Sequence, residues 1–414
     1  MACAASAWSQ VDVLGEKQAE VATLTSTARE VSRKLGEVAL SGAAITGKDA
    51  LAELKKLVAE LELVNERLSR VETELAAMKA NRPAPKAPAM ADEKVFKPSA
   101  YFQFQFRDSD EPGAEQHAWA LRRARIGGTY TIDSRSSAKM SFDAAAGTNQ
   151  ASFELKDVIL SYKLTTEGPS TMLRAGQFPL PLGYEIERSS SVREMPERSK
   201  ANRTLFNGER VRGAMVEHAI GGGVTAYAGL VNSLTVKDKE SNTASSTVGE
   251  QAGLAGLRYA GDNVTAGLGY MAGKRPAFTG TSGTSPEIDR HFLVADAGIT
   301  KIAGTGAYAR AEALVGKDRL ASSSGGAGLV AKDMNSYHLL VGYEFNARNQ
   351  LFGRYGTFDP DEDTAGNLFK EYGVGYRYLL SPGSMLTLTW EVNEDPTKTP
   401  KRFNIGTLRY QVKF

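Results

Sequence analysis

The segment Leu408-Arg409-Tyr410-Gln411-Val412-Lys413-Phe414 decides the fold class, because its apolar and polar residues alternate without a break. Successive side chains of a β-strand point to opposite faces, so the apolar residues of this segment share one face and the polar residues share the other. The same alternation recurs over residues 102–107 and 386–392. One apolar and one polar face suit a barrel wall between lipid and water. Soluble sandwiches alternate too, so the connections between strands must separate the two cases.

The connections favour a membrane barrel. About sixteen strands are predicted, over residues 101–107, 117–128, 138–146, 151–164, 171–177, 210–219, 223–231, 250–260, 263–272, 290–299, 306–316, 335–345, 349–358, 368–379, 384–392 and 403–414. Tight turns such as Gly221-Gly222 alternate with long polar stretches such as 178–209 and 232–249. Short turns at one rim and long loops at the other are typical of bacterial outer-membrane barrels. We therefore predict a membrane all-β fold, an antiparallel transmembrane β-barrel of about sixteen strands.

The composition agrees with a barrel and excludes other classes. The mean hydropathy is −0.31, and no stretch of the chain approaches the roughly 20 consecutive apolar residues that a membrane helix needs. A formal net charge of +2 is too small to indicate a nucleic-acid partner. The single cysteine, Cys3, rules out an intrachain disulfide. The stability of a barrel would therefore come from its closed ladder of hydrogen bonds.

An α-helical coiled coil is predicted before the barrel. Apolar residues there recur at alternating steps of three and four: Leu54, Leu57, Leu61, Val64, Leu68, Val71, Leu75 and Met78. An earlier run, from Val21 to Val38, has the same spacing. A seam this narrow must be covered by a partner, which is either the other run folded back or a neighbouring subunit. We assign the eight side chains to oligomerisation and leave both partners open.

Four regions are predicted along the chain. They are an N-terminal tail at 1–13, the helical coiled coil at 14–80, a Pro/Ala-rich linker at 81–95 and the barrel at 96–414. Within the tail, Ala5-Ser6-Ala7 is similar to a signal-peptidase site, so the tail is either a signal-peptide remnant or an alanine-rich extension.

The apparent motifs for catalysis, nucleotide binding and metal binding are incomplete. Gly42 to Lys48 follows the phosphate-binding pattern, but Asp49 stands where a Ser or Thr must follow. The aspartates at 359, 361 and 363 lack the glycine and terminal glutamate of a calcium loop. The four histidines are scattered and are interpreted as wall or rim residues: His117, His218, His291 and His338. We therefore predict no enzyme activity, no metal ligands and no cofactor.

Basic residues are predicted to line the pore. With the more apolar face of each strand outward, the candidates on the wall are Arg107, Arg123, Arg125, Lys139, Arg174, Arg310, Arg354 and Arg377. Lys163, Arg409 and Lys413 share this inward face, and they are opposed by Asp143, Asp157, Asp296, Glu312, Glu344, Glu371 and Glu391. The wall is thus positive by only a few charges. Arg122 becomes the pore residue only if the assignment of faces in its strand is reversed.

The stretch 179–209 is the predicted constriction, because it is the longest loop and porins commonly fold such a loop into the lumen. Its candidate anion contacts are Arg188, Arg193, Arg198 and Arg203. Glutamates in the same loop oppose them, and mixed signs would create a field across the pore that selects solutes by dipole and size. The alternative is that these charges solvate an external loop or pair with one another.

Four segments resemble the phosphate-selective porin O and P family of outer-membrane channels. They are Leu121-Arg122-Arg123-Ala124-Arg125-Ile126-Gly127, Arg174-Ala175-Gly176-Gln177-Phe178-Pro179-Leu180-Pro181, Glu197-Arg198-Ser199 and Leu408 to Phe414. The resemblance implies sixteen-stranded trimers and a passive, anion-preferring pore, with phosphate preference left open. In the last segment, Tyr410, Val412 and Phe414 are the candidate assembly signal for the barrel-assembly machinery.

The function predicted from all these patterns is an outer-membrane porin for small anions and hydrophilic solutes. The alternatives are an unselective general porin and a structural anchor whose coil reaches peptidoglycan or a wall polymer. The expected partners are a homotrimer and outer-membrane lipid, with no nucleic acid. The expected location is the outer membrane of a diderm bacterium, with the coil in the periplasm.

Overall fold

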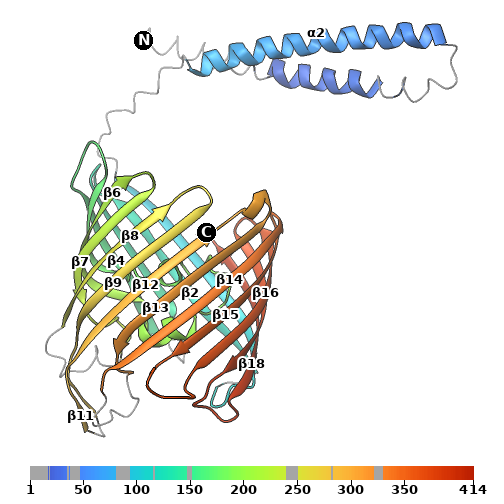
Figure 1. Ribbon diagram of the computed structural model, residues 1–414. Helices are drawn as coiled ribbons and strands as arrows, with labels where there is room; N and C mark the ends of the chain where they lie inside the picture. Colours follow the sequence, from blue (N-terminus) through green and yellow to red (C-terminus); the bar gives the residue numbers. More distant parts are fainter. Residues whose placement is uncertain are drawn as a thin grey trace. The chain divides into compact units, whose positions relative to one another are not determined.

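The computed structural model of this protein describes residues 17, 19–34, 37, 47–80, 94–114, 117–146, 152–238, 250–280, 283–320 and 330–414. The chain divides into two compact units, Met1–Ala91 and Asp92–Phe414, which Figure 1 shows as helical and all-β respectively. Among the described residues, no helix has the length and apolarity needed to cross a membrane.

The first unit is helical over residues 19–34 and in α2 (Gly47–Ala80). Both segments contribute buried apolar side chains: Leu24, Val31, Leu57 and Val71. Two ion pairs join the segments, Lys17 with Glu74 at 2.9 Å and Glu20 with Arg67 at 3.3 Å. Because the earlier residue of one segment pairs with the later residue of the other, the two segments run antiparallel. Within this chain the apolar seam is therefore covered by the other run folded back. The side chains of Leu54, Leu75 and Met78 lie outside the described residues.

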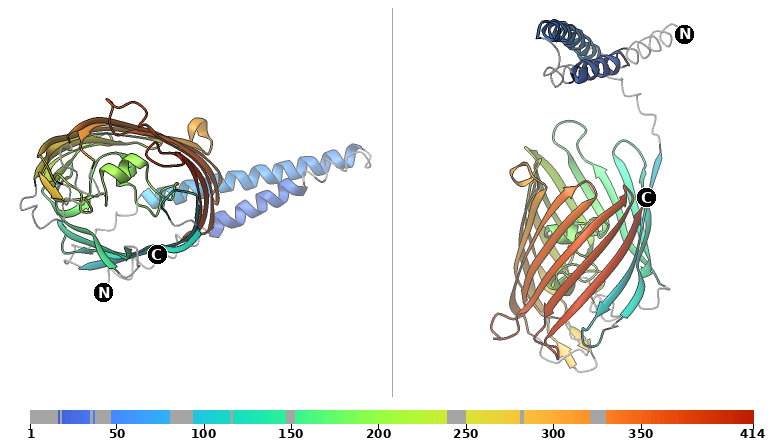
Figure 2. Two further views of the ribbon diagram at one scale, coloured as in Figure 1. Left: turned by 90° about the horizontal axis from the view of Figure 1, so that it is seen from below. Right: turned by 90° about the vertical axis from the view of Figure 1, so that its right-hand side faces the viewer.

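The second unit is a closed antiparallel barrel whose strands follow one another around the ring. Its strands are β1 (Val95–Ser109), β2 (His117–Thr131), β3 (Ser136–Ala146), β4 (Ser152–Lys163), β5 (Thr171–Pro179), β6 (Arg210–Gly221), β7 (Val224–Asn232), β8 (Gln251–Ala260), β9 (Val264–Arg275), β12 (Ile288–Ile299), β13 (Ala307–Asp318), β14 (Lys332–Asn346), β15 (Asn349–Asp359), β16 (Phe369–Ser381), β17 (Ser384–Glu394) and β18 (Arg402–Lys413). The ring closes where β1 pairs with β18 (Figures 1 and 2). The predicted sixteen-stranded barrel is confirmed.

Two details differ from the sequence prediction. Strand β1 begins at Val95 instead of residue 101, and its first residues pair only with β2, because pairing with β18 starts at Tyr101. Pro98 lies in this one-sided stretch, where its missing N–H does no harm. The second difference is a small hairpin, β10 (Phe278–Gly280) with β11 (Gly283–Ser285), inside a connection predicted as loop.

The two faces of the wall differ as the alternation requires. Large apolar side chains are exposed on the outside, among them Trp119, Phe153, Leu230, Val374 and Leu388. One rim is made of tight turns: Gly222 and Gly223, between β6 and β7, have φ of 58° and 83°, which glycine adopts without strain. The other rim carries the long connections. This asymmetry matches an outer-membrane barrel, whose tight turns face the periplasm.

The connection from β5 to β6, residues 180–209, folds into the barrel, and we call it the lumen loop. It crosses the inside of the ring in the end-on view (Figure 2, left) and contains α3 (Tyr184–Glu187) and α4 (Lys200–Leu205). The Ser199 side chain caps α4 by accepting the backbone N–H of Asn202.

One face of the lumen loop is apolar and packs on the inner wall. Its buried side chains include Leu180, Leu182, Ile186, Leu205 and Phe206. They share one core with inward side chains of β6 to β9, β12 and β13, among them Val211, Met215, Tyr227, Val231, Leu254, Met271, Phe292, Val294 and Leu314. Each fully buried apolar side chain contributes about 1.5–3 kcal/mol. The loop is thus a fixed part of the barrel interior, and the polar passages lie around its other sides.

Candidate functional site: the basic passages around the lumen loop

Arg122 and Arg123 both face the lumen because β2 contains a bulge at Arg122. The pairing with β1 steps from Gln103 opposite Arg123 to Phe104 opposite Leu121, which leaves Arg122 as the extra residue. Both guanidinium groups pair with Glu197 of the lumen loop, at 2.8 and 3.2 Å. With strict alternation only one of these two residues could face the lumen, whereas in the structure both do.

Glu197 also forms an ion pair with Arg409 of β18, at 3.2 Å. Three guanidinium groups therefore converge on one carboxylate. Burial alone would raise the pKa of Glu197, but Arg122, Arg123 and Arg409 hold it well below its ordinary value. The carboxylate stays ionised, and the cluster retains an excess of positive charge beside the lumen loop.

Further ion-pair clusters fasten the lumen loop to the wall, and those around Glu194, Glu209 and Arg354 are examples. Glu194 pairs with Arg188 of the loop and Arg310 of β13, each at 2.7 Å. Glu209 bonds to Arg198 and Arg210, and Asp157 of β4 pairs with Arg210 and Lys139, each at 3.1 Å. Arg354 of β15 pairs with Glu371 at 3.2 Å, Glu391 at 3.0 Å and Glu185 of the loop at 3.5 Å. Buried charges need such partners, so these clusters define where the loop sits.

The other predicted pore residues also lie on the inner wall or in the lumen loop, and most have partners. Arg125 pairs with Asp143 at 3.1 Å, Arg107 with Glu111 at 2.7 Å and Arg174 with Glu217 at 2.9 Å. Arg203 donates from Nε to the backbone oxygen of Arg198 at 2.9 Å, and Arg377 donates to the backbone oxygens of Arg193 and Glu194. The predicted site is thus a paired network and not a ladder of free cations.

Arg193 differs from the rest. Its side chain is buried, and within the described part of the chain none of its three guanidinium nitrogens has a hydrogen-bond partner. Burial, and next to it the charge of Arg198, lowers the pKa of Arg193 to about 9. The group is still cationic at neutral pH, and the charges of Glu197, Glu185 and Glu209 act on it.

Three cavities surround the lumen loop, and all are lined by more basic than acidic side chains. The largest, about 720 Å³, lies against β2 to β4, and its charged lining is Arg122, Arg123, Arg125, Lys156, Arg203 and Lys237 with Asp143, Glu154, Glu197 and Glu209. A second, about 280 Å³, is lined by Arg125, Lys139, Arg188, Arg198, Arg210 and Lys413 with Asp157 and Glu187. The third, about 370 Å³ at the tight turns, is lined by Arg188, Arg310, Arg348, Arg377 and Lys413 with Glu194 and Glu344.

The first two cavities share Arg125, and the last two share Arg188 and Lys413. The three cavities thus lie next to one another from the β2 side of the loop to the tight-turn rim. Positive charge thus gathers along this space, although the whole chain has a net charge of only +2.

The sequence prediction missed several residues of this lining. Lys156 is the extra residue of a second bulge, because the pairing of β3 and β4 steps from Ser141 opposite Asp157 to Phe142 opposite Leu155. Arg210 begins β6 inside the barrel, directly after the lumen loop. Two adjacent basic residues, as at 122–123, were the one feature of the sequence that could have indicated a bulge. A bulge depends on the register with the neighbouring strand, however, so it cannot be predicted from the sequence of one strand alone.

Comparison with known proteins gives the family. Residues 99–291 match the family model described as phosphate-selective porin O and P. Among curated proteins, no sequence matches this chain. The chain is similar in structure to the outer membrane channel DcaP of Acinetobacter baumannii, with a TM-score of 0.56 and 11% identity over 78% of this chain and 97% of that chain.

Two further solved structures share the fold. For OmpT, an outer membrane protein of Vibrio cholerae, the TM-score is 0.55 at 9% identity, with 79% of this chain and 99% of that chain covered. For OprB of Pseudomonas putida the TM-score is 0.52 at 9% identity, with 78% and 94% covered. The family match and the porin fold point to a channel rather than an enzyme. Residues 99–291 of the barrel thus match the phosphate-selective porin O and P family, and the fold is that of an outer-membrane porin channel.

Proposed function

We propose that this porin passes small anions, including phosphate-like oxyanions, in preference to cations. The observation that supports the proposal is the excess of basic side chains in all three cavities around the lumen loop. Rings of Arg and Lys select anions by replacing part of their hydration. Guanidinium groups also offer fork-shaped donors that match the geometry of oxyanions. Because most of these cations are paired with carboxylates, the preference is moderate, and hydrophilic neutral solutes pass as well.

The reversal potential across a lipid bilayer in asymmetric KCl tests this proposal. We expect the wild-type channel to favour chloride, and the double variant Arg122→Gln/Arg123→Gln to lose much of that preference because it removes two cations from the largest cavity. Lys401→Gln is the matched control, since Lys401 is exposed in the connection between β17 and β18 and lines none of the cavities.

The phosphate part of the proposal needs a separate measurement. Phosphate added to a chloride solution should reduce the chloride current as it occupies the passages. A channel that favours cations in asymmetric KCl contradicts the anion preference. If phosphate has no effect on the chloride current, the phosphate preference is wrong and the channel is a general porin, which is the alternative pore function.

For the assembly we propose a homotrimer in outer-membrane lipid, matured by the barrel-assembly machinery through Tyr410, Val412 and Phe414. The chain enters β1 at the tight-turn rim, which supports a periplasmic position for the helical unit. That unit could then reach peptidoglycan or another wall polymer and tether the barrel. The mass of the detergent-solubilised complex tests the trimer, and retention of residues 1–91 on purified peptidoglycan tests the tether.

A further inference from the structure

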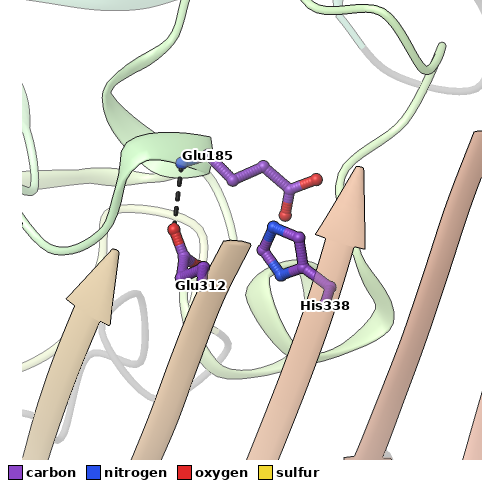
Figure 3. Close-up of side chains that lie close together, drawn as sticks. All are labelled: Glu185, Glu312 and His338. Atoms are coloured by element: carbon purple, nitrogen blue, oxygen red, sulfur yellow. Dashed lines mark hydrogen bonds between the residues drawn. The ribbon is translucent and has the colours of Figure 1, made fainter. Parts of the chain in front are cut away.

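Three buried side chains from three separate segments meet where the lumen loop touches the wall. They are Glu185 of α3, Glu312 of β13 and His338 of β14 (Figure 3). Each offers one carboxylate oxygen or ring nitrogen, and these three atoms all lie within 4.8 Å of one another. The cluster lies apart from the basic cavities, since none of its members is in their linings.

A surrounding layer of hydrogen bonds fixes the cluster in place. Glu312 accepts the backbone N–H of Glu185 at 3.1 Å, the dashed line of Figure 3. The Asn202 side chain donates to both carboxylates, at 2.8 Å to Glu185 and 2.9 Å to Glu312. The His338 Nε2 lies 2.9 Å from the Tyr184 hydroxyl. Polar groups that orient ligating side chains in this way are a regular feature of metal sites.

The charge around the cluster is not balanced by the protein. Within the described part of the chain, no Lys or Arg lies within ion-pair distance of the Glu312 carboxylate. The nearest cation to Glu185 is Arg354 at 3.5 Å, and Arg354 also serves Glu371 and Glu391. The four carboxylates are exposed by only 2–7%. Buried carboxylates without enough partners are costly, so this site requires a further positive charge from a proton or a cation.

The donor set favours one class of cation. Two carboxylate oxygens and one imidazole nitrogen suit Zn²⁺ and similar transition metals, whereas Ca²⁺ and Mg²⁺ prefer oxygen ligands alone. Zn²⁺ binds such ligands at about 2.0–2.2 Å in a tetrahedral arrangement, so two ligand atoms on one ion are about 3.3–3.6 Å apart. The three atoms, which lie within 4.8 Å of one another, therefore have to move closer by up to about 1.5 Å when an ion binds. Three protein ligands would leave a position for water.

We propose that Glu185, Glu312 and His338 form a binding site for a divalent transition-metal ion of the Zn²⁺ class. The ion supplies the missing positive charge and joins the lumen loop to β13 and β14. Its role is to hold the loop, and it does not depend on which solutes the pore passes.

Zinc binding to the folded, full-length protein tests the proposal. After chelator treatment and equilibrium dialysis against micromolar Zn²⁺, we expect one zinc ion per chain by elemental analysis. Glu312→Gln and His338→Gln should each lose it. The matched controls are Glu344→Gln, another inward acid of β14, and His291→Gln on β12, and both should keep it. Zn²⁺ should also raise the thermal unfolding midpoint of wild type and controls but not of the two cluster variants.

X-ray absorption of the zinc-loaded wild type keeps the test decisive if a cluster variant fails to fold. One nitrogen and otherwise oxygen ligands are expected. Either of two outcomes overturns the proposal. In the first, folded wild type binds no zinc, and protons neutralise the cluster. In the second, zinc binds equally well to the cluster variants, which places it elsewhere.

Discussion

Arg354 illustrates what single residues do in this lumen. It is almost fully buried and forms ion pairs with both Glu371 and Glu391. Its Nη1 also donates to the backbone oxygen of Glu197 in the lumen loop at 2.8 Å. One guanidinium group thus neutralises wall carboxylates and holds the loop, so its stabilising role and its positioning role cannot be separated.

Replacing Arg354 with Gln should therefore destabilise the barrel strongly. Removing one partner of a buried ion pair leaves uncompensated charge and costs about 3–5 kcal/mol. Arg107→Gln is the comparison, because the pair of Arg107 with Glu111 is partly exposed and such pairs contribute about 0–1 kcal/mol. Urea unfolding of the barrel in lipid vesicles measures both. If both variants lose the same free energy of unfolding, the burial of Arg354 does not increase the cost of removing its charge.

The Glu197→Gln substitution should increase anion preference and also destabilise the barrel, because the buried Arg123 and Arg409 lose a charged partner. It removes the carboxylate on which Arg122, Arg123 and Arg409 converge, while the amide can still accept hydrogen bonds. Reversal potentials in asymmetric KCl would detect the change. A shift toward cations would mean that these three groups do not face the conducting passage.

At the scale of elements, the lumen loop behaves as an inner layer of the barrel. Strand β12 shows the effect, since Phe292 and Val294 face the loop while Leu293 faces outward. The strand is apolar on both faces over this stretch, unlike β18 with its strict alternation. The wall under the loop is a packed core, and the opposite wall is polar.

Truncating the loop core should loosen the loop. Leu182→Ala removes a fully buried side chain, and Leu→Ala changes in cores cost about 2–5 kcal/mol. Leu230→Ala, on the lipid side of β7, is the matched control because Leu230 is 61% exposed. Single-channel recordings should show larger current fluctuations for the first variant only. If the Leu182→Ala variant shows no larger current fluctuations and the same free energy of unfolding as wild type, the loop is held by its ion pairs alone.

The ion pairs of the lumen loop should make the channel insensitive to pH near neutrality. Burial tends to raise, but neighbouring arginines lower, the pKa of Glu194, Glu197 and Glu209. A carboxylate with a lowered pKa contributes fully above its ordinary value of about 4.3 and loses this contribution as pH falls through the folded value. Titration of these three carboxylates should thus change the conductance only in acid stronger than about pH 5. A transition between pH 5 and 8 would point to another group such as Glu187 of the loop, whose pKa is raised by burial.

The sequence predicted the strands well because alternation along each strand is a local property. It also identified the loop that fills the lumen and the basic residues around it. It could not predict the bulges at Arg122 and Lys156, which depend on pairing with β1 and β3. Nor did it show that Glu185 and His338 meet, since the contact needs both the folded loop and the closed barrel.

On the scale of the whole molecule, the net charge is small, but basic and acidic side chains lie in different parts of the barrel interior. The formal net charge is only +2, yet the passages around the lumen loop are basic, while carboxylates such as Glu312 and Glu371 are buried under the loop. A solute in the passages therefore meets a positive field that the overall charge does not reveal.

This sorting makes salt a test of the whole arrangement. The screening length falls from about 10 Å at 0.1 M to about 3 Å at 1 M, so wall charges no longer act across the passage at high salt. Anion preference should decline steadily over this range in wild type and should be weak at all concentrations in Arg122→Gln/Arg123→Gln. Selectivity that persists unchanged at 1 M would point to direct ion binding instead of the field of the wall.

The seam between β1 and β18 has a consequence for how the molecule forms. It joins Tyr101 to Lys413 and Ser109 to Ile405, the two ends of the barrel sequence. Every other neighbouring pair of strands is close in the chain and can form early, whereas this contact has to wait until β18 has been synthesised. Until it forms, both edge strands have unpaired backbone groups that lipid cannot satisfy. Closure of the barrel therefore cannot precede the synthesis of β18, and the earlier strands have to be kept from aggregating until β18 is available.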